Sequence, residues 1–595
     1  MKMASPTSAN IDAPLRIRLH RQCGACNHLF LPGDHLVALL CNEKSIRAYS
    51  VLTFVPNSQC KLLEHDNIQF CMHHICGFCS KLNEGEESVT VHADCLSMFG
   101  QTCSAPDKYQ RLWIAGTRIY PWRTVAPLEL DPGCCASPEL ISSAAGLHRT
   151  LLPELADIIG GYLQPHHALL RFCSVIRLAK ELSRAEMDYA VTYPLCEVLS
   201  WSRGASPTLV EQGQAANPRV RLTIDSRGIE RIERVSDDSQ ETTRDLLTNS
   251  HAYVVDLVEQ LSGVSIGFQL GMSRLQVPTS VNISIWNVPS PQDLPRTTCI
   301  TFHGKLSSGR FAALDLDPKQ CTGLSFFLSI RQIMAIHGHT KRGSRAPQAF
   351  QHLNRDHSPG LFWIYIPITA NDKVIAIGTR EAYIANGGSY SIVLKMKSGT
   401  YFIGFPLVKI MGPIDETLHL IQEADDRHLT LIHEVPYNTG ISFIAVDKVT
   451  RTTSRIIIKR SNFPHYSTHS YASLEGVVNA RVLRDKEKGM CRGILLEYED
   501  GTLRALGQCR LGLDTVQCYK HPTKFHYTIV KYSSHIKTHD SRCLQAAFDS
   551  ESGLFSTHNN SEWKTCPMKG FLQFSFNHFG VAVRYHDAWR PHFDY

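Results

Sequence analysis

The chain has 595 residues, of which 43% are hydrophobic and 19% are charged, and its formal net charge is +6. One hydrophobic core rarely serves so long a chain, so we expect two to four domains. The composition excludes a disordered or collagen-like chain, and the net charge is too small for this length to indicate nucleic-acid binding.

Targeting signals are not evident in the sequence. No apolar run reaches the 18 residues that a transmembrane helix requires, and residues 1–18, expected to be a flexible tail, contain no apolar segment typical of a secretory signal. These features predict a cytoplasmic or nuclear protein with no membrane partner. In such a reducing compartment, clustered cysteines favour metal binding over disulfides.

Cysteine and histidine residues are concentrated in residues 19–104, which we predict to form a small zinc-binding domain. Eleven of the twenty cysteines precede residue 136. Two Cys-x2-Cys pairs and the segments "CMHHIC" and "HADC" have spacings that let neighbouring side chains reach one ion. The eight candidate ligands are Cys23, Cys26, Cys71, His73, Cys76, Cys79, His92 and Cys95.

The order of these eight ligands resembles the cross-braced zinc fold of the RING family. The resemblance implies two structural zinc ions. One would be held by Cys23, Cys26, Cys76 and Cys79, and the other by Cys71, His73, His92 and Cys95. LIM-like or treble-clef pairings of the same residues remain open, with His28, Cys41, Cys60 or His74 as substitutes. A metal-free cysteine-rich core is a further alternative.

Residues 105–145 contain several prolines and two tryptophans, Trp113 and Trp122. They predict an irregular linker that packs against a neighbouring domain, because tryptophan is costly to leave in water.

Residues 146–200 follow with apolar residues at helical spacing, which predicts a helical hairpin. The segment starting "LLPEL" resembles an F-box, the motif that docks a protein onto the adaptor of a cullin-type ubiquitin ligase. By this resemblance Leu152, Pro153, Leu155 and Ile159 would bind that partner. The alternative is an ordinary hairpin in which the same side chains are core.

Residues 201–415 and 416–595 predict two β-rich modules, of sandwich or prism-like architecture, because short apolar runs alternate with turn residues. Asp500-Gly501 indicates a tight hairpin turn. A helix is expected only at "HAYVVDLVEQL", residues 251–261. The fold class is therefore a multidomain α+β protein with a zinc-binding head, an F-box-like hairpin and a large β-rich C-terminal region.

Enzyme signatures are few. "GVSIG" places Ser265 in the pattern of a hydrolase nucleophile, but a helix-like run precedes it where a strand is required. His337 and His339 are too few for a metal site. A surface groove lined by Trp363 and Tyr365 would instead favour a lectin-like module that binds a glycan.

The combination of a zinc-like head, an F-box-like hairpin and a β-rich body resembles large multidomain proteins of filamentous fungi. We therefore expect a non-enzymatic adaptor that recruits a target, recognised by the β-rich region, to a cullin-type ligase. The alternatives are a lectin-like binding module and a serine hydrolase that uses Ser265.

Overall fold

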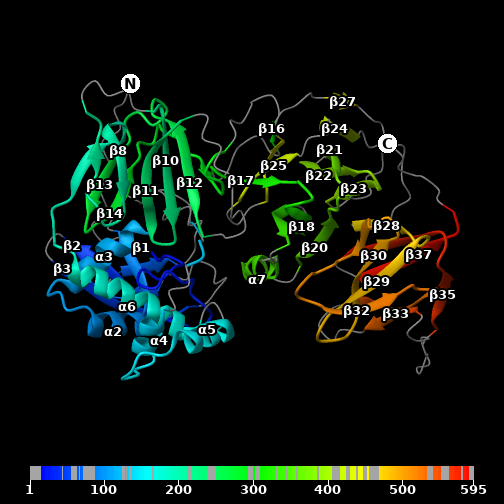
Figure 1. Ribbon diagram of the computed structural model, residues 1–595, viewed down its shortest axis with the longest axis horizontal. Coiled ribbons are helices and arrows are strands. Elements are labelled where there is room, and N and C mark those ends of the chain that lie inside the picture. Colours follow the sequence, from blue (N-terminus) through cyan, green and yellow to red (C-terminus); the bar gives the residue numbers. More distant parts are fainter. Residues whose placement is uncertain are drawn as a thin grey trace, which may run out of the picture. The chain divides into compact units, whose positions relative to one another are not determined.

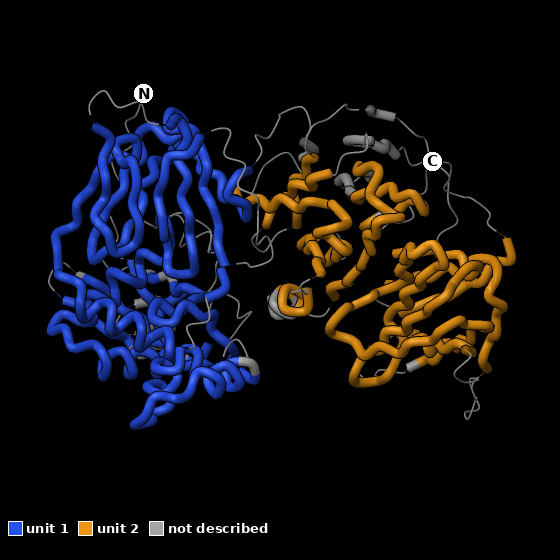
Figure 2. The backbone as a smooth tube through the Cα atoms, viewed as in Figure 1, with its two compact units in different colours: residues 1–291 blue, residues 292–595 orange. Residues whose placement is uncertain are grey.

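The computed structural model describes most of the chain, and its strands far outnumber its helices (Figure 1). The described residues are 15–42, 45–54, 63–65, 68–71, 87–123, 128, 130–132, 137–163, 167–211, 217–236, 250–291, 299–301, 309–329, 332–341, 346–356, 360–384, 387–404, 416–423, 429–436, 440–446, 452–454, 468–532, 541–550, 562–577 and 580–588. The chain forms two compact units, residues 1–291 and 292–595 (Figure 2).

The first unit begins with a small head of two three-stranded sheets. One sheet has the order β1 (Leu15–Arg18), β5 (Ile68–Cys71), β4 (Leu63–His65), and the other β3 (Ser45–Thr53), β2 (His35–Asn42), β6 (Ser88–His92). The apolar run of β2 is paired on both sides, which explains why Leu36, Leu39 and Leu40 are almost fully buried. Helix α2 (Ala93–Thr102) follows β6 directly.

The segment predicted as an irregular linker contains a helix, α3 (Lys108–Arg118). Leu112, Ile114 and Ala115 of α3 are buried against the head. The expectation that the tryptophans are packed is confirmed in part, since Trp122 is buried and the Trp113 indole donates to the Glu87 carbonyl. Residues 105–118 therefore belong to the head.

Three helices come next, α4 (Pro138–Ala144), α5 (Pro153–Tyr162) and α6 (Ala168–Arg184). The side chain of Ser137 caps α4 by accepting from the Leu140 amide, and Pro153 occupies the first turn of α5, where no amide donor is needed. The predicted helical hairpin is thus present, with α4 as an additional helix.

The described residues from 191 to 286 form mainly strands. They are β7 (Val191–Pro194), β8 (Val198–Ser202), β9 (Thr208–Leu209), β10 (Arg219–Asp225), β11 (Gly228–Val235), β12 (Ala252–Leu257), β13 (Ser265–Gln269), β14 (Met272–Gln276) and β15 (Ile285–Trp286), with the short helix η1 (Leu195–Glu197) between β7 and β8. Neighbouring strands follow the orders β15-β12-β10-β11-β8-β9 and β14-β13-β7.

The helix predicted at residues 251–261 is wrong, because its first half is strand β12. Val254 and Val255 pair with Leu222 and Arg221 of β10. β-Branched side chains pack well on a pleated surface, and here the pairing with β10 overrides the helical spacing of the apolar residues.

The described part of the second unit contains many strands and one helix. Its first part comprises β16 (Cys299–Thr301), β17 (Arg310–Asp315), β18 (Cys321–Leu328), β19 (Ile333–Thr340), α7 (Ala346–Asp356), β20 (Phe362–Pro367), β21 (Val374–Ile384), β22 (Gly387–Met396), β23 (Gly399–Ile403), β24 (Glu416–Glu423), β25 (Thr430–Glu434), β26 (Phe443–Val446) and β27 (Thr452–Ser454). The strand orders are β19-β18-β20, β23-β22-β21-β24-β27 and β16-β26-β25-β17.

A larger sheet closes the chain. It contains β28 (Thr468–Ser473), β29 (Val477–Arg484), β30 (Cys491–Tyr498), β31 (Leu503–Gly507), β32 (Thr515–Lys520), β33 (Lys524–Tyr532), β34 (Ser541–Asp549), β35 (Lys564–Pro567), β36 (Phe571–Asn577) and β37 (Gly580–His586). The hairpin predicted at Asp500-Gly501 is confirmed: it joins β30 to β31, and Gly501 has a φ of 77°.

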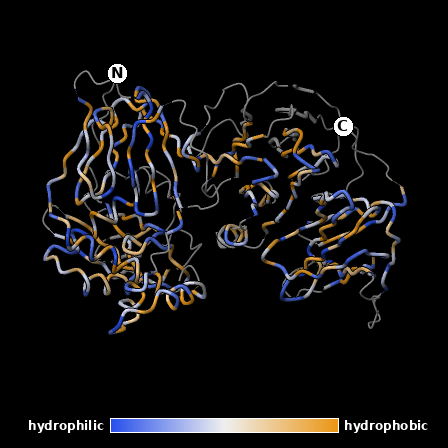
Figure 3. Tube along the Cα trace, viewed as in Figure 1, coloured by the Kyte–Doolittle hydropathy of each residue, from blue (hydrophilic) through white to orange (hydrophobic). Residues whose placement is uncertain are grey.

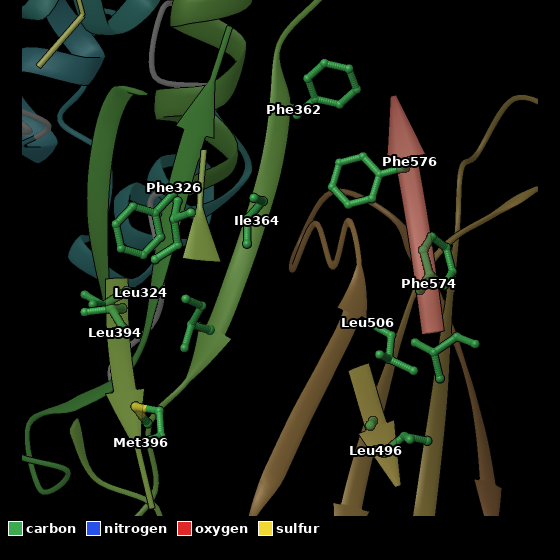
Figure 4. Packing of buried hydrophobic residues seen from close by; sticks show 14 of the residues in the cluster. Leu324, Phe326, Phe362, Ile364, Leu394, Met396, Leu496, Leu506, Phe574 and Phe576 are labelled. Atoms are coloured by element: carbon green, nitrogen blue, oxygen red, sulfur yellow. The ribbon is translucent and has the colours of Figure 1, made fainter. Parts of the chain in front are cut away.

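One hydrophobic core runs through the second unit. Side chains of β18, β20, β22, β30, β31 and β36 contribute to it, and the Phe362 and Phe576 rings lie 5.6 Å apart (Figure 4). Hydrophobic and hydrophilic segments alternate along the strands of both units (Figure 3). The β-rich majority of the predicted fold class is therefore confirmed.

The structure divides the chain at positions other than those predicted. The predicted boundary at residue 415 falls between β21 and β24, which pair over residues 376–382 and 416–423. The predicted boundary at residue 200 falls inside β8. Loop composition indicated these boundaries, but pairing between strands distant in sequence decides which segments share a core.

Candidate metal centre

The Cys23–Cys26 pair lies in a tight turn of the head. The Cys23 amide donates to the His28 carbonyl, the Asn27 amide donates to the Cys23 carbonyl, and Asn27 adopts a positive φ of 63°. These bonds fold residues 23–28 back on themselves. Both sulfurs consequently face the same side of the turn, as the two-residue spacing predicts.

The second pair of ligands lies where a strand passes into a helix. His92 is the last residue of β6, and Cys95 is in the first turn of α2. The three-residue separation places both side chains on the same face of the helix start. Asp94, between them, accepts a hydrogen bond from the Cys95 amide, 2.7 Å in length.

These two pairs form one buried cluster, which we call the four-ligand cluster: Cys23, Cys26, His92 and Cys95. Their ligand atoms all lie within 4.8 Å of one another. The Nδ1 atom of His92 is 3.6 Å from the sulfur of Cys26 and 3.6 Å from that of Cys95. In a tetrahedral zinc site with ordinary bond lengths, nitrogen and sulfur ligands stand about 3.6 Å apart.

Further hydrogen bonds hold the ligands in place. The other ring nitrogen of His92, Nε2, lies 3.1 Å from the Asp34 carboxylate, which also accepts from the Leu31 amide. The His92 amide donates to the Cys23 sulfur over 3.4 Å. Because Nε2 donates to Asp34, Nδ1 is the ring nitrogen that faces the sulfurs.

The electrostatics of the four-ligand cluster favour a cation. Burial raises the pKa of the Cys26 thiol to about 11, with a further contribution from Cys23. Burial acts in the same direction on Cys23, but hydrogen bonds from Cys26 and Cys95 and the charge of His92 bring its pKa well below the ordinary value. Several thiols thus compete for one positive partner, and a divalent cation would stabilise all of them as thiolates.

The donor set fits zinc. Three sulfurs and one imidazole nitrogen form a closed set of four ligands, and all four residues are at most 1% exposed. A closed site has no position for a substrate, so its chemistry is structural: bound zinc would cross-link the Cys23–Cys26 turn to the start of α2. The donor set and burial therefore support the predicted zinc binding for one cluster.

The predicted pairing of ligands is wrong for this cluster. Cys23 and Cys26 meet His92 and Cys95, which the RING-like pairing assigned to the other ion. It is one of the alternative pairings that the spacing leaves open. The reason is topological: β2 pairs with β6, and the Gly24 amide donates to the Thr90 carbonyl of β6, which brings the turn to the strand that ends at His92.

Of the other four predicted ligands, Cys71 alone lies within the described residues, and it does not belong to the four-ligand cluster. Cys71 is buried in β5, and its carbonyl accepts from the Leu19 amide. His73, Cys76 and Cys79 lie outside the described residues, as do the substitutes Cys60 and His74. Of the remaining substitutes, His28 directs Nδ1 at the Cys26 carbonyl, and Cys41 lies in β2. The predicted second ion therefore stays a prediction.

Asp34 was missed by the sequence analysis. It lies in the turn "PGDH", which resembles many surface turns. Its spacing of 58 residues from His92 provides no signal, because the contact arises only when β2 pairs with β6.

The F-box-like residues differ in exposure. Leu152 and Leu155 are 64% and 46% exposed, and Pro153 is exposed as well. Ile159 is instead partly buried against Ile141, Ala156 and Cys173. Its assignment as a partner-binding residue stays a prediction: Ile159 lies partly against this cluster, whereas its neighbour Ile158 is 55% exposed.

The residues expected for the two alternative functions, a serine hydrolase and a lectin-like module, lie in environments that differ from those expected. Ser265 begins strand β13, and its hydroxyl donates to the Gln276 side chain, so the strand–turn–helix context of a hydrolase nucleophile does not occur there. Trp363 and Tyr365 are buried in β20, not in a groove. The Trp363 indole donates to the Ser325 hydroxyl, which contacts Nε2 of His339 at 2.6 Å.

Comparison with known proteins does not assign this chain to a family. A scan against models of protein families found no match, and neither did a search of curated proteins. Within the described residues, no helix is long and apolar enough to cross a membrane.

Proposed function

We propose that this protein is an adaptor in which a zinc-stabilised head carries a helical docking surface for the adaptor subunit of a cullin-type ubiquitin ligase. The β-rich region would select the protein or glycan to be recruited. The observation that carries the proposal is a row of exposed apolar side chains on α5, which we call the docking stripe: Leu152, Leu155, Ile158 and Tyr162.

The docking stripe follows helical spacing. Successive members are three or four residues apart, so they lie along one side of α5 and its N-cap. They are 64%, 46%, 55% and 86% exposed in chain order. Soluble proteins rarely leave a continuous apolar row in water, and such a row marks an interaction surface.

The side of α5 next to the docking stripe has a different role. Ala156 is 1% exposed, and it packs with Ile141 of α4 and Cys173 of α6, while Ile159 lies against the same cluster. The helix is therefore anchored along one side and presents the docking stripe on the adjoining side. This division favours the docking interpretation over an ordinary hairpin, in which Leu152 and Leu155 would be the core residues.

The identity of the partner is proposed from the F-box-like sequence of the docking stripe. The stripe combines aliphatic side chains with one tyrosine, and Glu154 and Asp157 are exposed beside it. An apolar groove with a basic rim would complement this surface. The zinc site contributes stability to a head whose own hydrophobic core is small.

The test is a binding experiment with the purified full-length protein and the purified cullin adaptor subunit. The double variant Leu152→Ala/Leu155→Ala should lose at least about tenfold in affinity, because apolar anchors at the centre of an interface contribute most of the binding energy. Its melting temperature should stay close to that of the parent, since both side chains are largely exposed.

Leu147→Ala is the matched control. Leu147 is 47% exposed but lies between α4 and α5, away from the docking stripe. This variant should bind like the parent. If the parent does not bind the adaptor subunit, or if the double variant loses stability and not affinity, the proposed function is wrong.

A further inference from the structure

Helix α6 connects the four-ligand cluster to the docking stripe. One face of α6, formed by Val175, Leu178, Ala179 and Leu182, packs into the same core as Cys23, Cys26 and Cys95. Another part of its surface, around Cys173, packs with Ala156 of α5. The same helix therefore contacts the metal-binding core on one side and the inner face of α5 on the other.

An ion pair reinforces the first contact. The Arg171 guanidinium donates to the Asp94 carboxylate over 2.7 Å. Asp94 stands between the ligands His92 and Cys95, and it also accepts from the Cys95 amide. Any rearrangement of the ligand backbone at the start of α2 would therefore move the acceptor to which the first turn of α6 is bound.

The other end of α6 is held by the helix that follows α2. The buried Arg111 of α3 donates to the carbonyls of Leu182 and Ala185 over 2.7 and 2.5 Å. Leu182 is in the last turn of α6 and Ala185 is its C-cap residue, and carbonyls at this end have no partners inside the helix. Near them, the Ser183 hydroxyl donates to the Cys103 sulfur, just beyond α2.

We infer that the metal centre positions the docking stripe, acting through α2 and α6, and that the Arg171–Asp94 pair is one link of this coupling. The inference rests on the proposed function, whose docking surface it regulates. Metal bound to the four-ligand cluster holds the start of α2, α2 holds α6, and α6 holds the inner face of α5. Loss of the metal loosens α5 and α6, and with them the arrangement of the stripe.

The test is hydrogen exchange measured by mass spectrometry on the full-length, zinc-loaded protein before and after treatment with a chelator. Peptides from α5 and α6 should exchange at least about tenfold faster once the zinc is removed, because their protection depends on packing against the metal-binding core. Peptides from β29 and β30 of the second unit are the internal control and should not change.

Arg171→Gln tests the link itself. It should keep the zinc content of the parent and accelerate exchange in α6 by about two- to fivefold, the range expected for a partly exposed ion pair. Arg177→Gln is the matched control. Arg177 is on the same helix, but its partner Glu181 is in α6 too, at 3.5 Å, so this variant should leave the coupling to zinc unchanged.

The outcomes separate the two proposals. The inference is overturned if zinc removal leaves the exchange rates of α5 and α6 within twofold of their original values. It is also overturned if exchange in β10 and β11 accelerates equally, because that would indicate general unfolding. If Arg171→Gln behaves like Arg177→Gln, the Arg171–Asp94 pair is not a link in the coupling. None of these measurements needs the cullin adaptor, so coupling without adaptor binding would refute only the proposed function.

Discussion

The imidazole Nε2 of His92 lies 3.1 Å from the carboxylate of Asp34, while Nδ1 of the same ring lies 3.6 Å from two cysteine sulfurs. By accepting from Nε2, Asp34 orients the ring so that Nδ1 faces the sulfurs, where it could bind a metal. Burial alone would lower the pKa of His92, but the Cys23 thiolate and Asp34 raise it to about 12. A histidine with so high a pKa carries a proton on each ring nitrogen. Bound zinc would replace the proton on Nδ1.

The contribution of Asp34 can be measured directly. Asp34→Asn should lower zinc affinity by about 10- to 100-fold, because the amide neither accepts as strongly from Nε2 nor increases the basicity of the ring. Competition with a chromophoric chelator provides the affinity. Asp157→Asn, an exposed change on α5, is the control and should bind zinc like the parent. Equal affinity of the two variants would show that Asp34 does not position His92.

The four-ligand cluster predicts a definite stoichiometry. Cys26→Ser should reduce the zinc content by one ion per chain relative to the parent, since a hydroxyl is a poor zinc ligand. Elemental analysis of protein purified without chelators checks this. Cys321→Ser is the control: Cys321 is buried in β18 of the second unit, and its replacement should leave the zinc content unchanged. Parent protein without zinc would contradict the metal assignment.

Two adjacent isoleucines should respond in opposite ways. Ile159→Ala should reduce the free energy of unfolding by about 1–3 kcal/mol, because the side chain packs between α4, α5 and α6. Ile158→Ala should cost less than about 0.5 kcal/mol, because Ile158 is 55% exposed. Denaturant unfolding followed by circular dichroism measures both. The reverse order would show that the faces of α5 are assigned incorrectly.

Gly228 occupies a position where no side chain fits. Its φ is 99°, and a Cβ atom would stand 2.0 Å from the Arg118 carbonyl oxygen of α3. Gly228→Ala should therefore cost at least about 3 kcal/mol, through strain and a steric clash. Gly204→Ala, with a φ of 87° and open space around the Cβ position, should cost only about 1 kcal/mol. Thermal unfolding of both variants tests this difference.

Acid should destabilise the second unit through two histidines of β19, His337 and His339. Burial lowers the pKa of His337 to about 4 and that of His339 to about 3, whereas an unfolded histidine titrates near 6.5. The unfolded state binds these protons first, so stability is complete above about pH 6.5 and declines as the pH falls towards 4, by about 1.4 kcal/mol per pH unit for each histidine.

His339→Gln isolates one of these contributions. Its unfolding free energy should depend less steeply on pH between 6.5 and 4 than that of the parent, whatever its stability at neutral pH. Urea titrations at several pH values measure the slope. His148→Gln replaces an exposed histidine of the first unit and should retain the parent's slope. An unchanged slope in His339→Gln would mean that His339 is not held neutral.

Several features of this protein follow from its sequence because they depend on neighbouring residues. The pair Cys23–Cys26 and the pair His92–Cys95 are each brought together by local turns, so their spacing alone indicates ligands. The turn at Asp500-Gly501 depends on the positive φ that glycine allows. The α5–α6 hairpin follows from helical spacing and the position of Pro153.

Other features depend on contacts that no local pattern records. The pairing of β2 with β6 decided that Cys23 and Cys26 meet His92 and Cys95. The same pairing placed Asp34 beside His92. Pairing with β10 made residues 252–257 a strand. The choice between Ile158 and Ile159 as the outward residue was decided by the position of Cys173 on α6. Strand pairing and helix packing join residues far apart in sequence, and their free energy exceeds the local preferences of any single segment.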